Sequence, residues 1–363
     1  MKIAILTPGF LTFDGVSRAV EDQAVELAQQ RHSVSIFALD ANMKPPQNVG
    51  LYLLGAPKSL LGQRMYRLFF PLDFMKAIKW LPKLKGFDII YSHQYPMTWL
   101  AYLAKRFYGA KYIYYNHGIG WPGVFSSFVE RTYMNVFALL ANWTIARADG
   151  AISISRFMQQ ELKKETGLDS EVIYRKADAR RFHPEVDGSR IRQKHNLNNT
   201  PIILYVGVVS PHKGIHLLLQ AFRLVKREVP DARLLIVGKH TFNGYSKKLK
   251  QACDDSVIFT GDVPDEDLPQ YYAACDVYAT ASLWEGFNLP LAEARACGKP
   301  VIAFRLCSHP EVVNDGESGI LVKPNNVEEF AKGITKALQS KDEMGEKAAK
   351  WDEGFVRHSK GSG

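Results

Sequence analysis

Apolar residues in this chain follow two alternating patterns, short continuous runs and longer segments with helical spacing. The runs predict buried strands at 3–7, 34–39, 88–93, 111–116 and 150–155. Between the first two runs, the segment 16–30 places Val16, Val20 and Leu27 on one side of a helix. Strands that alternate with helices are typical of βαβ units, so the first half of the chain predicts a parallel sheet covered by helices.

The same pattern restarts after residue 200. Further strands are predicted at 201–207, 232–238, 256–260, 277–281, 300–304 and 319–322, and helices at 216–228, 265–274 and 290–296. The polar, charged segment 182–199 separates the halves, as an exposed domain boundary should. A chain of 363 residues also suits two cores better than one. We expect an α/β protein with two Rossmann-like, doubly wound domains at 1–184 and 185–345, followed by a tail at 346–363.

Composition narrows the class of protein. Hydrophobic residues make up 46% of the chain and charged residues 23%, an ordinary globular balance. No apolar run reaches the roughly 20 residues of a membrane span, and the N-terminal run is too short for a signal peptide. The four cysteines show no zinc-binding spacing, which favours free thiols in a reducing compartment. We therefore expect a cytoplasmic protein.

The formal net charge of +9 favours an anionic partner, such as a phosphate compound, a nucleic acid or an anionic membrane. We expect no nucleic-acid partner, because the chain has neither the basic and aromatic repeat of an RNA-binding sheet nor a zinc finger. Charge alone does not choose between the other two.

The segment 285–293, EGFNLPLAE, follows a predicted strand and opens a predicted helix. A glycine-containing turn at a helix start presents backbone N–H groups and the positive end of the helix dipole, which together suit a diphosphate. Pro290 fits the first helical turn, where no N–H is required. Glu285 and Glu293 would flank the phosphate and accept hydrogen bonds from sugar hydroxyls. The alternative is a capped helix with two solvated glutamates.

A second loop, 207–214 (GVVSPHKG), follows the first strand of the second domain and precedes its first helix. Ligands of open α/β sheets bind beyond the carboxyl ends of the strands, so Lys213 in this loop is placed to neutralise a diphosphate. Gly207 and Gly214 permit the tight turn. The alternative is a solvated surface lysine.

These motifs together resemble the retaining glycosyltransferases of family 4, which have the GT-B fold. The resemblance rests on the segment 285–293, the upstream Lys213-Gly214 pair and the segment 294–303, ARACGKPVIA. The stretches 257–264 and 268–276 resemble the family's surroundings of the nucleotide base, and 148–155 resembles the last strand of its first domain. The similarity extends over nearly the whole chain. It implies two domains that face a central cleft, with the acceptor on the N-terminal side and the nucleotide-sugar on the C-terminal side.

The resemblance also implies roles for individual residues. Glu285 would hydrogen-bond the transferred sugar, Glu293 the ribose, and Lys213 the diphosphate. His117 matches the family's histidine near the donor sugar, although a structural histidine is the alternative for this residue. The full expected donor-binding set is Gly15, Gly207, Lys213, Gly238, Lys239, Asp262, Val263, Leu268, Glu285, Gly286, Phe287, Asn288, Leu289 and Glu293, with His117, Lys213 and Glu285 as catalytic residues.

The expected reaction moves a hexose from a nucleoside-diphosphate sugar to a hydroxyl of a glycan or lipid-linked acceptor. Negative charge grows on the leaving diphosphate, and preorganised donors together with Lys213 would stabilise it. The resemblance implies retention of configuration by same-face attack without a bound metal. No DxD-like metal motif stands in a suitable loop, which agrees with this, and we expect no cofactor besides the donor substrate.

The sequence departs from the family pattern at several points. Val208 stands where an arginine is usual, and Lys239, Arg18 and His212 are candidate replacements for the missing cation. The segment 175–178 reads RKAD instead of the usual Asn-Gly-x-Asp, and the tail is shorter than usual, either naturally or by truncation. A GT-B scaffold without turnover, acting as a binding or regulatory subunit, is therefore an alternative.

Two other enzyme classes fit less well. A nicotinamide-dependent oxidoreductase lacks its Gly-x-Gly-x-x-Gly after the first strand. A sugar phosphorylase of related fold would need a longer chain and a cofactor lysine.

The segment 58–85 is basic and aromatic, with Asp73 as its one acidic residue. Such a stretch favours contact with an anionic membrane surface, and hence a lipid-linked acceptor and a peripheral location at the inner face of the cell membrane. The alternative is a pair of ordinary helices whose aromatic residues belong to the core. After His117, the segment 118–123 with Gly118 and Trp121 is a candidate acceptor loop.

Overall fold

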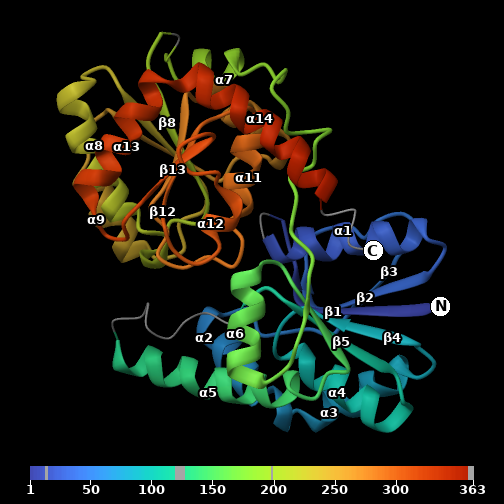
Figure 1. Cartoon of the computed structure of the whole chain (residues 1–363). Coiled ribbons are helices and arrows are strands. Elements are labelled where there is room, and N and C mark those ends of the chain that lie inside the picture. Colours follow the sequence, from blue (N-terminus) through green and yellow to red (C-terminus); the bar gives the residue numbers. More distant parts are fainter. Residues whose placement is uncertain (13–14, 119–126, 198, 359–363) are drawn as a thin grey trace. The chain divides into compact units, whose positions relative to one another are not determined.

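The computed structural model describes residues 1–12, 15–118, 127–197 and 199–358, and the chain divides into two compact units, Met1–Ile173 and Tyr174–Gly363 (Figure 1). This division lies before the boundary that we expected after residue 184, because the segment 174–184 packs with the second unit. The Tyr174 hydroxyl donates to the Glu311 carboxylate over 3.0 Å. The ring of Phe182 packs edge-on against that of Tyr272 at 5.7 Å.

Unit 1 contains a seven-stranded parallel sheet in the order β3-β2-β1-β4-β5-β6-β7. The strands are β1 (Lys2–Phe10), β2 (Ser33–Ala41), β3 (Gly50–Leu53), β4 (Ile89–Ser92), β5 (Lys111–Asn116), β6 (Gly150–Ser153) and β7 (Glu171–Val172). The helices are α1 (Gly15–Gln29), α2 (Leu60–Phe69), α3 (Phe74–Trp80), α4 (Met97–Tyr108), α5 (Phe128–Ile145) and α6 (Arg156–Thr166). Neither β3 nor β7 was predicted: β7 has only two residues, and β3 was overlooked although it reads GLYL.

Unit 2 contains a six-stranded parallel sheet in the order β10-β9-β8-β11-β12-β13. The strands are β8 (Ile202–Val206), β9 (Arg233–Val237), β10 (Val257–Gly261), β11 (Val277–Thr280), β12 (Val301–Phe304) and β13 (Gly319–Val322). The helices are α7 (Ser189–Lys194), α8 (Ile215–Glu228), α9 (Asn243–Gln251), α10 (Leu268–Ala274), α11 (Leu289–Ala296), α12 (His309–Val312), α13 (Val327–Gln339) and α14 (Lys341–His358). The predicted doubly wound α/β architecture is confirmed in both units.

Burial explains why the strands read as apolar runs. Helices pack on the sheets, and every residue of β8, β11 and β12 is buried. In unit 2, α8 packs against α13, while α11 packs against α10 and α14 (Figure 1). Each sheet also reverses its strand order once, between β1 and β4 in unit 1 and between β8 and β11 in unit 2. Ligands of such sheets bind at the carboxyl ends of the strands beside the reversal.

The C-terminal segment belongs to unit 2. Residues 346–358, the described part of the tail expected at 346–363, continue helix α14, which begins at Lys341. The Lys341 ammonium donates to Asp276 over 2.7 Å, and α14 packs against α11 and α13. All four cysteines are free thiols, as predicted. Among the described residues, no helix has both the length and the apolar character needed to span a bilayer.

Candidate active site

Two loops meet beside the strand-order reversal of unit 2, the one after β8 and the one after β11. Gly214 makes the approach possible, because its φ is +64° and a Cβ on it would lie 2.0 Å from the Ala281 carbonyl oxygen. The Leu283 N–H donates to the His212 carbonyl over 2.8 Å and joins the two loops. Lys213 and Glu285, predicted from separate motifs, are thereby brought into contact.

Lys213 and Glu285 form an ion pair, with Lys213 Nζ 2.6 Å from Glu285 Oε1. Burial by itself would raise the pKa of Glu285, but the Lys213 charge and hydrogen bond outweigh it and lower this pKa below its usual range. Both side chains are largely buried, at 21% and 11% exposure. The site therefore holds a fixed cation beside a carboxylate that stays charged at neutral pH.

Asn288 ends the loop that carries Glu285 and occupies the N-cap position of α11, in the left-handed region with φ 65°. Its Nδ2 lies 2.9 Å from His309 Nε2, and His309 Nδ1 lies 2.8 Å from the Phe304 carbonyl. The carbonyl can only accept, so Nδ1 carries the proton and Nε2 accepts from Asn288. Burial also lowers the pKa of His309. A neutral histidine therefore holds the loop at the start of α11.

The start of α11 has the features expected of a phosphate seat. No side chain caps this helix, and Pro290 occupies its first turn. Gly286 and Phe287 precede the N-cap, and Leu289 is the first residue of the helix. The Phe287 side chain is buried in the core. Glu293 lies in the next turn at 2% exposure, where it accepts a hydrogen bond of 2.7 Å from the Tyr272 hydroxyl of α10. Tyr272 thus fixes the orientation of the predicted ribose-binding carboxylate.

The other expected donor-side residues lie at the same edge of the sheet. Gly207 and Gly238 follow β8 and β9, and a Cβ on Gly238 would lie 2.1 Å from the Gly207 carbonyl oxygen, so the two loops touch. Lys239 follows directly and is exposed. After β10 come Asp262, which is exposed, and then Val263 and Leu268, whose side chains are buried.

The three candidate replacements for the missing arginine differ in the structure. Burial, with the nearby Lys213 charge, lowers the pKa of His212 to about 4, so His212 is neutral at pH 7 and cannot supply the charge. Lys239 is exposed at the same sheet edge as Val208. Arg18 belongs to α1 in unit 1. Within unit 2, Lys239 is the candidate that the structure supports.

In unit 1, two histidines meet at the carboxyl ends of β4 and β5. His93 Nδ1 lies 2.9 Å from Nε2 of His117, and His93 Nε2 lies 2.8 Å from Gln23 Oε1 of α1. The ring of Tyr115 stacks on both imidazoles, with centroids 4.7 and 5.0 Å away. His117, the predicted catalytic histidine, is thus a buried member of a stack of three rings, and His93 and Gln23 help to fix its position.

Sequence reasoning missed several residues that fix these groups. His93 was identifiable, since it follows a strand beside the strand-order reversal, the position that singled out Lys213. His309, Gln23 and the pairing of Tyr272 with Glu293 carry no such signal, because they reach the site from distant segments. Gly15 opens α1, and the Gly118 N–H donates to the Asn116 side chain over 2.9 Å. Trp121 lies outside the described residues.

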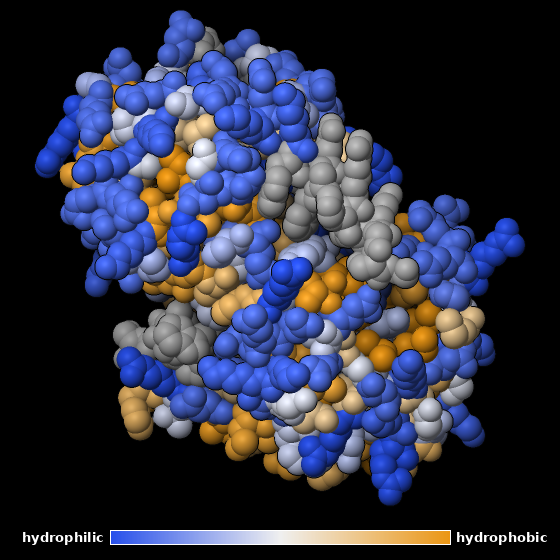
Figure 2. Space-filling view, in the orientation of Figure 1, coloured by the Kyte–Doolittle hydropathy of each residue, from blue (hydrophilic) through white to orange (hydrophobic). Residues whose placement is uncertain are grey.

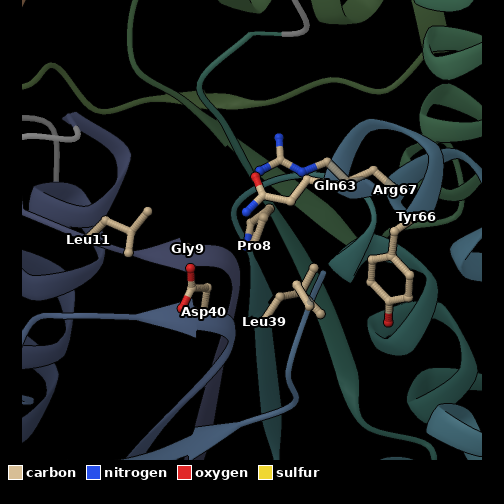
Figure 3. A pocket seen from close by; sticks show the side chains of 9 residues that line it. Pro8, Gly9, Leu11, Leu39, Asp40, Gln63, Tyr66 and Arg67 are labelled. Carbon is tan, nitrogen blue, oxygen red and sulfur yellow. The ribbon is translucent and has the colours of Figure 1, made fainter. Parts of the chain in front are cut away.

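Unit 1 also contains a small, partly open pocket beside the ends of β1 and β2, with a cavity volume of about 40 Å³. It is lined by Pro8, Gly9, Leu11, Leu39, Asp40, Ala56, Gln63, Tyr66 and Arg67. Gln63 and Arg67 extend from α2 over Pro8, and Asp40 approaches from β2 (Figure 3). The pocket therefore combines a carboxylate, an amide and a guanidinium with apolar walls.

Comparison with known proteins covers both units. The family model described as Glycosyltransferase Family 4 matches residues 13–181, and that described as Glycosyl transferases group 1 matches residues 187–354. The O-antigen chain mannosyltransferase B of Escherichia coli is 35% identical over 155 residues, which cover 41% of this chain and 40% of that protein. A GDP-mannose-dependent alpha-(1-6)-phosphatidylinositol monomannoside mannosyltransferase of Mycolicibacterium smegmatis is 29% identical over 256 residues, 66% of this chain and 64% of that protein.

The matched segments thus span less than two thirds of either relative. The fold is shared more completely. The crystal structure of Anabaena Alr3699/HepE in complex with UDP and glucose superposes with a TM-score of 0.80 at 24% identity, covering 99% of this chain and 97% of that one. Two family models in tandem and the two parallel-sheet units lead to the same assignment: the chain belongs to the family 4 glycosyltransferases with the GT-B fold.

Proposed function

We propose that the protein is an active retaining glycosyltransferase that transfers a hexose from a nucleoside-diphosphate sugar without a bound metal. The observation that carries this proposal is the Lys213–Glu285 pair beside the N-terminus of α11. The site combines the Lys213 cation and the backbone N–H groups of the helix start, which suit a diphosphate, with the Glu285 carboxylate, which suits a sugar hydroxyl. Relatives named as mannosyltransferases and a structural neighbour bound to UDP and glucose support a hexose donor.

The chemistry follows from where charge develops. When the bond between the anomeric carbon and the phosphate oxygen breaks, the leaving diphosphate gains negative charge and the sugar becomes oxocarbenium-like. Lys213 and the N-terminus of α11 stabilise the diphosphate. These protein groups supply the positive charge that a metal ion supplies in metal-dependent enzymes. The acceptor hydroxyl attacks from the face that the diphosphate leaves, and its proton passes to the departing phosphate oxygen. Glu285 orients the sugar, and Glu293 binds the ribose.

For the acceptor, we propose the pocket of unit 1. Among the described residues, Asp40, Gln63 and Arg67 engage in no hydrogen bond or ion pair through their side chains, so all three can bind a ligand. A carboxylate and an amide suit sugar hydroxyls, and a guanidinium suits a phosphate or carboxylate. These groups suit a glycan or lipid-linked acceptor, and we further propose that the protein meets it at a membrane surface.

A thermal-shift panel tests the donor side. UDP, GDP, ADP and their hexose conjugates are added to wild type, Glu293→Ala and the matched control Glu328→Ala, which changes a glutamate of α13 instead. A ligand at about 100 times its Kd should stabilise the fold by roughly 2.7 kcal/mol. We expect one nucleotide family to raise the Tm of wild type and control but not of Glu293→Ala. No shift with any nucleotide would support a scaffold without turnover.

A further inference from the structure

We propose that α2, α3 and α5 of unit 1 form one docking surface for an anionic lipid bilayer, with part of their apolar side chains inserted among the lipids. The term docking surface refers below to residues 64–85 and 128–143. It deepens the proposed function, on which it rests only for the identity of the acceptor, since lipid binding itself requires no glycosyl transfer.

The first observation is where exposed apolar side chains lie. Among the side chains that the structure describes, all the strongly exposed large hydrophobic ones belong to unit 1. Most come from two segments: Met65, Phe69, Leu72, Phe74, Met75 and Ile78 from the first, and Phe128, Val129, Val136, Leu139 and Trp143 from α5. Exposure reaches 78% for Met75 and 82% for Phe128. Figure 2 shows hydrophobic side chains along the margin of unit 1 where Figure 1 places α5 and α3. Exposed apolar side chains gathered on a few neighbouring elements mark a candidate interaction site.

The second observation is that α5 carries apolar side chains on its exposed face as well as on its buried face. Val129, Val136 and Trp143 follow one another at intervals of seven residues, so they share one helix face, and that face is exposed. The opposite face, with Ala141 and Ile145, is buried against the domain. A helix that is apolar on both its inner and outer faces needs an apolar environment outside as well.

The two segments belong to one surface because polar contacts join the start of α5 to α2. The Tyr133 hydroxyl of α5 donates to the Arg64 carbonyl of α2 over 2.9 Å. Arg64 also pairs with Glu130 at 3.6 Å. The start of α5 is therefore held beside α2.

The third observation is charge, which selects the occupant. Of the chain's 46 basic and 37 acidic residues, seven basic and one acidic residue lie in 58–85, so this segment alone carries +6 of the net +9. Lys79, Lys83 and Lys85 are exposed there. A second apolar protein surface would not require this charge, whereas the anionic headgroups of a bilayer attract basic residues. Charge complementarity therefore favours lipid.

The structure also limits which residues take part. Phe70, Trp80 and Leu84 are buried in the core of unit 1, so the part of the segment that we expected at the membrane includes ordinary core residues. Helix α2 has a double role: Gln63, Tyr66 and Arg67 line the pocket, while Met65 and Phe69 are exposed. An acceptor whose sugar entered the pocket would thus have its lipid close to the docking surface, which points to a lipid-linked acceptor.

Vesicle co-sedimentation tests the proposal with phosphatidylcholine vesicles and with vesicles that also contain phosphatidylglycerol. We expect binding to the anionic vesicles only, weakened by salt. Met75→Ser/Ile78→Ser should weaken it by about tenfold or more through lost apolar burial. The matched control Leu53→Ser/Ile173→Ser changes exposed apolar residues outside the docking surface and should bind as wild type does.

A second pair separates local charge from net charge. Lys79→Glu/Lys85→Glu should weaken binding by at least about tenfold, whereas Lys247→Glu/Lys248→Glu, with the same change in net charge on α9, should not. Equal effects of the two pairs, or no binding of wild type to anionic vesicles, would overturn the proposal. So would a homodimer in solution that Met75→Ser/Ile78→Ser dissociates, since a second copy would then be the occupant. The nucleotide thermal shift is independent of lipid, so each proposal can fail alone.

Discussion

Lys213 and Glu285 are 72 residues apart in the sequence, yet Lys213 Nζ lies 2.6 Å from Glu285 Oε1. Each residue comes from a loop after one of the two central strands, β8 and β11, where the strand order of the sheet reverses. Without donor, each side chain compensates the charge of the other. A bound diphosphate would give Lys213 a second anion, so substrate binding and the state of Glu285 are linked.

Replacement of Lys213 by methionine should leave Glu285 buried without its cation. We expect Lys213→Met to reduce the free energy of unfolding by roughly 3 kcal/mol and Lys213→Met/Glu285→Gln to recover most of this loss. Urea unfolding of both variants measures the difference. Equal free energies of unfolding for the single and the double variant would show that the unpaired Glu285 charge is not the cause of the loss. In activity assays each change should lower kcat by about 100-fold or more.

The left-handed conformation of Asn288 predicts an order of stabilities among its variants. Asn288→Gly keeps the backbone conformation and loses only the hydrogen bond to His309. Asn288→Ala also adds backbone strain, so it should be less stable than the glycine variant by about 1 kcal/mol. Chemical denaturation measures both, and nucleotide affinity should fall in the same order. If the alanine variant is as stable as the glycine variant, the left-handed conformation imposes no backbone strain on alanine at this position.

His93 should act as a positioning residue for His117. His93→Leu removes the 2.9 Å contact between the imidazoles, and we expect kcat to fall by about tenfold with little change in the donor KM. His93→Asn retains a polar partner for His117 and should recover part of the rate. If leucine and asparagine lower kcat equally while both variants melt like wild type, His93 has no positioning role.

Burial of His212 predicts a pH dependence of stability. The folded protein protonates His212 only near pH 4, whereas the unfolded chain does so near the usual pKa of 6.5. Between these values the unfolded state binds more protons, so the free energy of unfolding falls as the pH falls from 6.5 to 4. His212→Asn should flatten the curve of stability against pH in this window. A slope unchanged from wild type would mean that other groups account for it.

Val208→Arg tests whether the missing cation limits the enzyme. Val208 lies in the loop after β8, near Lys213, and its carbonyl accepts from the Tyr205 hydroxyl, a contact that the substitution keeps. An added guanidinium should raise donor kcat/KM by about tenfold if the charge is lacking. If Lys239 already supplies it, Val208→Arg should have little effect and Lys239→Ala should lower kcat/KM instead. The pair of variants decides between the two cations.

Local patterns in the sequence were enough to predict the two sheets and the loops that hold Lys213 and Glu285. Buried parallel strands must be apolar along their whole length, so β1, β8 and β12 were visible as runs, and the strand-loop-helix order placed Lys213 and Glu285 at carboxyl ends. The edge strand β7 was not visible, because its two residues form no run, whereas β3 carries an apolar run that was overlooked. Membership of the family could be inferred from the motif residues for the same local reason.

Only the tertiary structure decided which of these groups meet and in which state of charge. The contacts of Lys213 with Glu285, Asn288 with His309 and His93 with His117 join segments that no periodicity connects, since packing of the sheet determines their distances. Burial then sets the protonation state of individual side chains. It keeps His212 neutral at pH 7, although His212 was a candidate cation in the sequence. Likewise, 58–85 reads as uniformly basic and aromatic, but folding buries Phe70 and Trp80 and leaves Phe69 and Met75 exposed, because a helix turns its residues to both sides.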